Sequence, residues 1–90
     1  MIIYVVEYND SNYNEATYLG NSLMNNCPDT YSLIRAEDTY TGGGIKASDA
    51  IRTIEHTYRD RATVHKRTSN KVVGVEVWYT KIEIEKTDQT

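Results

Sequence analysis

Cysteine and proline are scarce in this chain, and phenylalanine is absent. Its 90 residues include one cysteine and one proline. A single cysteine excludes an internal disulfide, which is typical of proteins from a reducing compartment, so we expect a cytoplasmic location. Cys27 stands before Pro28 with no histidine nearby in the sequence, which favours a passive thiol over a nucleophile.

Long apolar runs are also missing. A membrane-spanning helix needs about 20 mostly apolar residues, and no segment approaches that length. Residues 1–6 carry no basic stretch, so we read them as the start of a strand and not as a signal peptide. The sequence therefore predicts no membrane partner.

Catalytic and metal-ligating patterns are lacking as well. The two histidines, His56 and His65, match no common zinc spacing. No Ser-His-Asp set or paired carboxylates stand out, although Asp49 and Glu55 lie near His56 in the sequence. We expect no metal, no cofactor and no enzymatic activity. A small nuclease or transferase that uses either histidine is the less favoured alternative.

The composition that is present is that of a globular chain. Hydrophobic residues make up 39% and charged residues 26%, which is unlike a disordered segment. The length suits one domain, which we place at residues 1–86, with 87–90 as a loose tail. Eight tyrosines supply most of the aromatic content, and tyrosine suits a thin core and an interface equally well.

The first half of the chain predicts two strands around one helix. Residues 2–8 are apolar on both parities, which indicates a strand covered at least partly on both faces. A helix is expected over 13–25, with Asn12 as its N-cap and Glu15 completing a capping box. A shorter strand follows at 31–36.

The second half predicts a helix and a hairpin. Ser48 is the expected N-cap of the helix, which turns an apolar face toward the core. Residues 62–67 are expected to pair with 72–85 across a turn near Ser69 and Asn70, because serine and asparagine favour turns.

The last strand changes phase along its length. Val75, Val77 and Tyr79 share one parity, whereas Ile82 and Ile84 share the other. Either a bulge near residues 79–81 resets the pleat, or the two halves of the strand face different environments.

The elements together predict an α+β domain in the order β-α-β-α-β-β. We expect an antiparallel or mixed sheet of about four strands with two helices packed on one face. This arrangement is similar to ferredoxin-like two-layer sandwiches, an architecture that hosts unrelated functions.

Charge is divided unevenly along the chain. The net charge is −3, yet residues 1–45 hold one basic and six acidic residues, and 46–90 hold nine and seven. Residues 52–71 concentrate six basic residues and both histidines against two acidic residues. Such a stretch either attracts phosphates or an acidic protein, or forms a solvated surface.

A glycine-rich loop at residues 42–44 precedes the second helix. Backbone amides in such a loop, the helix N-terminus and a nearby lysine can together hold an anion, although the spacing matches no Walker or dinucleotide motif. A flexible surface loop is the simpler reading. The residues predicted to bind an anion are Gly42, Gly43, Gly44, Lys46, Ser48, Arg52, Arg59, Lys66 and Arg67.

A second candidate is an apolar surface around Trp78. The hairpin register that we expect places Trp78 on the face opposite the core, and Ile82 and Ile84 extend this surface. Trp and Tyr are frequent anchors of protein contacts, so His65 and Tyr40 join the predicted protein interface. The alternative is that Trp78 lies in the core.

Two functions follow from these features. The favoured hypothesis is a non-enzymatic protein-binding module, in which a protein partner or a second copy in a homodimer covers the Trp78 surface. Small chains of this composition are common among phages and mobile elements, which suggests an inhibitor or accessory factor acting on a host protein in the host cytoplasm. The alternative is a binder of a phosphate-bearing ligand, either a nucleotide or RNA or DNA, with Tyr40 stacking on a base.

Overall fold

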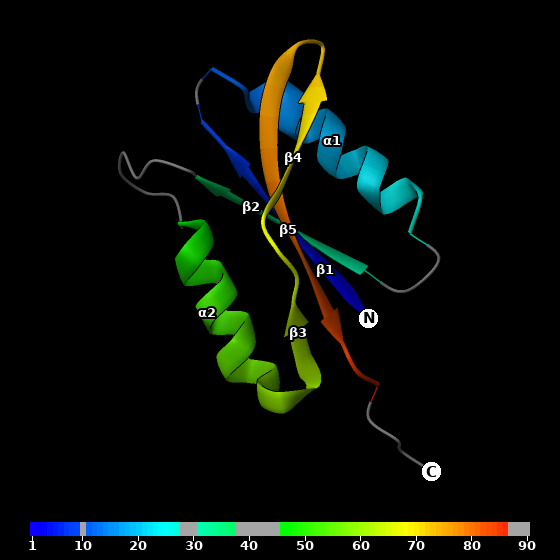
Figure 1. The fold of residues 1–90 in the computed structure, drawn as a ribbon, viewed down its shortest axis with the longest axis vertical. Coiled ribbons are helices and arrows are strands. Elements are labelled where there is room, and N and C mark those ends of the chain that lie inside the picture. Colours follow the sequence, from blue (N-terminus) through cyan, green and yellow to red (C-terminus); the bar gives the residue numbers. More distant parts are fainter. Residues whose placement is uncertain (10, 28–30, 38–45, 87–90) are drawn as a thin grey trace.

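The computed structural model describes residues 1–9, 11–27, 31–37 and 46–86 (Figure 1). The elements are β1 (Ile2–Tyr8), α1 (Tyr13–Asn25), β2 (Tyr31–Glu37), α2 (Ala47–Tyr58), a 3-10 turn η1 (Arg59–Arg61), β3 (Ala62–Val64), β4 (Thr68–Val72) and β5 (Val75–Ile84). No helix in these ranges is long and apolar enough to cross a membrane. The predicted tail at 87–90 lies outside the described residues.

The strands form one mixed sheet. Its order is β2-β1-β5-β3, with β4 also paired to β5. Strand β1 is parallel to β2 and antiparallel to β5, and both β3 and β4 are antiparallel to β5. Because β3 and β4 pair with different parts of β5, they lie one after the other and the sheet is four strands wide. The predicted α+β class, with about four strands and two helices, is confirmed.

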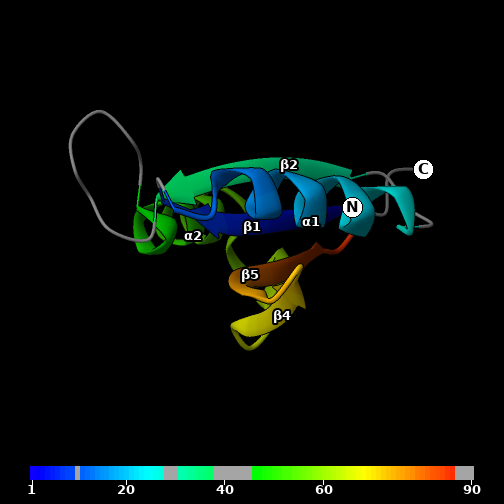
Figure 2. The same cartoon turned by 90° about the horizontal axis from the view of Figure 1, so that it is seen from above.

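The two helices cover opposite faces of this sheet, which corrects the predicted packing on one face. Ile3 and Val5 lie in a core cluster with the inner side of α2, whereas Tyr4 and Val6 lie in a second cluster with α1. Successive residues of a strand point to opposite faces, so the helices must lie on either side of β1. Figure 2 shows α1 in front of β1 and β2, with α2 partly hidden behind them.

The chain topology explains this arrangement. Helix α1 connects β1 to its parallel neighbour β2, and α2 then connects β2 back across β1 and β5 to β3. Strand β3 runs parallel to β2, because both β1 and β3 are antiparallel to β5. Crossovers between parallel strands are almost always right-handed, so two that run in opposite directions lie on opposite faces.

The phase change in β5 follows from the same arrangement. Val77 lies in the α1 cluster and Ile82 in the α2 cluster, and both are fully buried. Pairing with β1 runs without interruption from Val6–Tyr79 to Ile2–Glu83. Of the two alternatives, the second is correct: the pleat is continuous and the two halves of β5 face different helices.

A bulge does occur, but in the edge strands opposite β5. Val64 pairs with Ile82 and Thr68 pairs with Tyr79, so three residues, 65–67, lie opposite two, 80–81. One extra residue reverses the alternation of side chains between the faces. Val64 and Arg67 therefore lie on the same face of the sheet, the α2 face, although their positions differ in parity.

The hairpin turns at Val73 and Gly74 and not at Ser69 and Asn70. Both turn residues have positive φ, 48° and 80°, which is the signature of a type I′ turn. Ser69 and Asn70 lie within β4 instead. The prediction was wrong because Val73, a β-branched residue, is a poor residue for this conformation and concealed the turn.

The helix limits agree with the predictions better than the caps do. Helix α1 begins and ends where expected. The side-chain oxygen of Asn12, however, accepts a hydrogen bond from the backbone amide of Asn9 at 2.7 Å and makes no capping hydrogen bond to the helix. Helix α2 begins earlier than expected, with Lys46 at the N-cap position and Ser48 inside the first turn.

Candidate functional site

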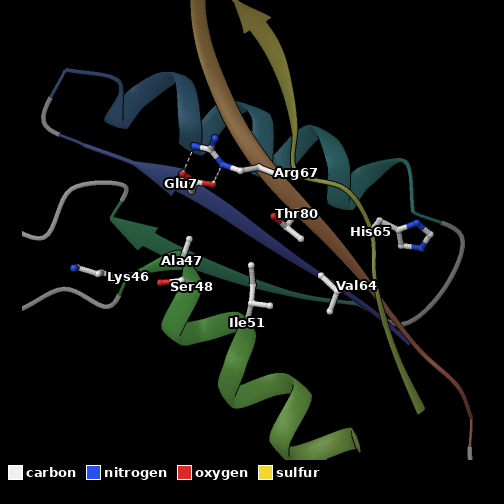
Figure 3. Close-up of a pocket in the computed structure, with 9 residues that line it drawn as sticks. All are labelled: Glu7, Lys46, Ala47, Ser48, Ile51, Val64, His65, Arg67 and Thr80. Atoms are coloured by element: carbon white, nitrogen blue, oxygen red, sulfur yellow. Dashed lines mark hydrogen bonds and ion pairs between the residues drawn. The ribbon is translucent and has the colours of Figure 1, made fainter. Parts of the chain in front are cut away.

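A pocket of about 460 Å³ opens where the carboxyl end of β1, the first turn of α2 and the edge-strand bulge meet (Figure 3). It lies on the α2 face of the sheet. Its lining residues are Glu7, Lys46, Ala47, Ser48, Ile51, Val64, His65, Arg67 and Thr80.

The position of the pocket follows from the topology. Strands β1 and β2 are parallel neighbours, and the helices that follow them pass to opposite faces of the sheet. In open sheets of this kind, the crevice beyond the carboxyl ends of such strands is the usual place for a ligand. Glu7 at the end of β1 and Ala47 at the start of α2 both line the pocket.

Glu7 and Arg67 form a bidentate ion pair on one side of the pocket. The Arg67 Nε and Nη2 groups donate to the two carboxylate oxygens at 2.6 and 2.7 Å, as the dashed lines in Figure 3 show. The Glu7 side chain is only 7% exposed, whereas that of Arg67 is 50% exposed. Parallel N–H···O bonds of this kind fix the guanidinium plane as well as supplying charge.

Two further features hold Arg67 in place. The edge-strand bulge brings it onto the face that carries Glu7. Its guanidinium carbon then lies 4.1 Å from the centre of the Trp78 ring, a cation–π contact. Trp78 is thus half-buried beside the pocket and shields one side of the ion pair.

Thr80 contributes a hydroxyl group that faces the pocket. The residue is 3% exposed, and Figure 3 shows its side chain directed toward the centre of the pocket. This hydroxyl makes no hydrogen bond in the described part of the chain, where no fully buried polar side-chain atom lacks a partner, so the hydroxyl oxygen is open to the pocket. A hydroxyl that faces a pocket can both donate to and accept from a ligand.

The first turn of α2 supplies positive electrostatic potential. Lys46 is exposed at the mouth of the pocket, and Ala47 and Ser48 line it. The amide of Ala50 is the first to bond within the helix, to the Lys46 carbonyl at 3.0 Å. The preceding amides, those of residues 47–49, have no acceptor in the helix and give its N-terminus a partial positive charge.

Another part of the lining is apolar. Ile51, one turn further along α2, and Val64 of β3 both line the pocket, and both also pack against the α2 core cluster. His65 borders this wall, but its ring points away from the pocket, and its Nε2 lies 2.7 Å from a Glu83 oxygen.

The structure brings together some of the predicted anion-binding residues. Lys46, Ser48 and Arg67 line one pocket. Arg52, Arg59 and Lys66 are exposed and do not line it, and Arg52 lies 3.8 Å from Asp49 instead. The loop residues Gly42, Gly43 and Gly44, and also Tyr40, lie outside the described residues.

The predicted apolar interface is wrong in its main part. Ile82 and Ile84 are buried beneath α2, at 0% and 6% exposure, and cannot reach a partner. The reason is the placement of α2 on the face that was expected to be open. Trp78 lies on that same face beyond the helix, where Arg67 covers its ring.

Two residues of the pocket were not predicted from the sequence. Glu7 is a charged residue within the apolar run of β1, on the parity of Ile3 and Val5, and this mismatch is a signal of a buried pair. Thr80 gives no such signal, because threonine is common in strands and its burial depends on the register between β1 and β5.

The described residues include no group of three or more histidine, cysteine or acidic side chains that could hold a metal ion. No protein-family model matches the chain, and no curated protein or solved structure shows significant similarity to it.

Proposed function

We propose that this protein binds a small phosphate-bearing ligand in the pocket at the N-terminus of α2. The ligand's phosphate lies against the first turn of the helix. There it accepts hydrogen bonds from the backbone amides, the Lys46 ammonium group and the Ser48 hydroxyl group. The rest of the ligand extends toward Thr80. Ligand recognition, and not a chemical step, is the activity.

One observation carries the proposal. The helix N-terminus with Lys46 and Ser48 shares a single pocket with Thr80, a residue that is 3% exposed and whose hydroxyl faces the pocket and makes no hydrogen bond in the described part of the chain. Helix N-termini favour anions, and a polar group aimed into a pocket favours a ligand that bonds to it. The pocket volume of about 460 Å³ is in the range of small-molecule sites.

The protein-binding hypothesis keeps only part of its predicted surface. Two of its three apolar residues, Ile82 and Ile84, belong to the core. The pocket, by contrast, contains three members of the predicted anion set, so its geometry supports the phosphate-binding alternative better.

Ribose 5-phosphate, a phosphate monoester without an aromatic ring, tests the proposal. In a titration followed by amide NMR, it should shift the resonances of residues 47–49 first. Replacing Lys46 by alanine should weaken binding about fivefold, equivalent to about 1 kcal/mol for one exposed charged contact, and should flatten its dependence on salt.

Arg52→Ala is the matched control, because it removes the same charge from the same helix outside the pocket, at a side chain that is 79% exposed. It should leave the affinity within twofold of the original. Equal losses in the two variants, or no shift at residues 47–49 at millimolar ligand, would contradict the proposal.

A further inference from the structure

The pocket has a second half that a phosphate group alone does not use. Beyond the first turn of α2, part of its wall consists of Ile51, one turn after Ala47 on the same helix, and Val64 of β3 (Figure 3). Apolar walls with a few placed polar groups are typical of small-molecule sites, and an apolar wall can pack against the face of a flat organic ring. A ligand that carried only polar groups would leave this wall in contact with water.

The polar groups over this wall suit the edge of such a ring. The Thr80 hydroxyl points into the pocket, and the Glu7–Arg67 pair borders the same space. A hydroxyl that can donate or accept matches a ring edge that carries both kinds of atom. The ion pair, fixed by its two hydrogen bonds and by Trp78, presents a rigid polar border and not a mobile charge.

We infer that the ligand belongs to the class of nucleoside monophosphates. Its planar base lies against Ile51 and Val64 with one edge hydrogen-bonded to Thr80, and its phosphate lies at the first turn of α2. This inference rests on the proposed phosphate site and adds to it the base, which makes Thr80 a specificity-determining residue. The pocket volume of about 460 Å³ is that of a site for one small molecule.

Calorimetric titration compares the four common ribonucleoside monophosphates with ribose 5-phosphate. At least one nucleotide should bind ten times more tightly than ribose 5-phosphate, because only a nucleotide has a base that contacts the apolar wall and presents a ring edge to Thr80. Thr80→Val, which exchanges the hydroxyl for a methyl group of similar size, should weaken binding of that nucleotide five- to tenfold. The same variant should weaken binding of ribose 5-phosphate by a smaller factor, because that ligand has no base edge to bond to the hydroxyl.

Thr63→Val is the control, because Thr63 is exposed on the opposite face of β3 and should change neither affinity. Thermal melts of both variants confirm that they fold. If ribose 5-phosphate binds as tightly as every nucleotide and Thr80→Val changes nothing, the inference is overturned and the phosphate site stands. If none of these ligands binds the original protein, the proposed function fails with it.

Discussion

At the scale of single residues, the Glu7–Arg67 pair combines charge with burial. A carboxylate that is 93% buried needs a partner, and Arg67 supplies two hydrogen bonds to it. Breaking a buried pair by removing one partner costs about 3–5 kcal/mol, because it leaves a charge without compensation. Arg67 is half exposed, so water can partly replace it and the cost here is smaller.

We expect Arg67→Met to lower the free energy of unfolding by about 2–3 kcal/mol. Adding Glu7→Gln should restore part of that loss, because the buried charge is then gone. Urea unfolding of the two single variants and the double variant gives the coupling free energy. A coupling below about 0.5 kcal/mol, the scatter of independent sites, would show that the pair does not stabilise the fold.

Tyr4 is a second residue whose environment has a measurable consequence. Burial raises the pKa of its hydroxyl above the usual value of 10.0, and Cys27, Tyr79 and Glu83 add to this through unfavourable charge interactions. The unfolded chain therefore loses this proton at lower pH than the folded chain. Ionisation of Tyr4 does not change the free energy of unfolding at neutral pH, and it lowers this free energy as the pH rises above about 10.

Tyr4→Phe should remove this part of the alkaline destabilisation. The difference in free energy of unfolding between pH 8 and pH 11 should be smaller in the variant than in the original protein. Tyr18→Phe serves as the control, because Tyr18 is 67% exposed. An identical pH dependence in the original protein and Tyr4→Phe would exclude the effect.

At the scale of elements, the β4–β5 turn stores backbone strain. Val73 has φ 48° and is 94% exposed, so it gains no packing in return for this conformation. A left-handed conformation costs an ordinary L-residue about 1–2 kcal/mol, and asparagine tolerates it best among the non-glycine residues. Asn-Gly is also the preferred pair for a type I′ turn.

Val73→Asn should therefore raise the free energy of unfolding by about 1 kcal/mol and the melting temperature by about 4–8 °C. Gly74→Ala should have the opposite sign, since no atom lies near an added Cβ and the cost is that of the backbone at φ 80°. Differential scanning calorimetry measures both. A melting temperature that Val73→Asn leaves unchanged or lowers would show that the turn is not strained.

At the scale of the whole molecule, two core clusters share the same strands. Val5 belongs to the α2 cluster and Val6 to the α1 cluster, yet they are neighbours on β1. Because β1 and β5 contribute to both clusters, neither side can lose its packing without disturbing the other. The domain should unfold as one cooperative unit.

Val5→Ala and Val6→Ala test this coupling as a matched pair, since both side chains are fully or almost fully buried. Each should lower the free energy of unfolding by about 2–3 kcal/mol, from lost burial and the cavity left behind. Each should also keep a single transition when Trp78 fluorescence and far-UV circular dichroism are compared. Separate transitions for the two signals would contradict a shared core.

The sequence by itself determined the kinds of element and most of their limits. The apolar run of β1, the amphipathic face of α1 and the split phase of β5 are local patterns, and each is visible without knowledge of the partner element. They were sufficient for the α+β class, and the two apolar parities of β1 already indicated cover on both faces.

Only the tertiary structure decided which faces the helices cover and which residues meet. The opposite placement of α1 and α2 depends on strand order, and the meeting of Glu7, Arg67 and Thr80 depends on strand register and on one extra residue in the edge-strand bulge. A shift of one residue moves a side chain to the other face of a sheet, so local patterns cannot specify such contacts. Because α2 covers this face of the sheet, Ile82 and Ile84 lie in the core and a pocket is left at the start of α2.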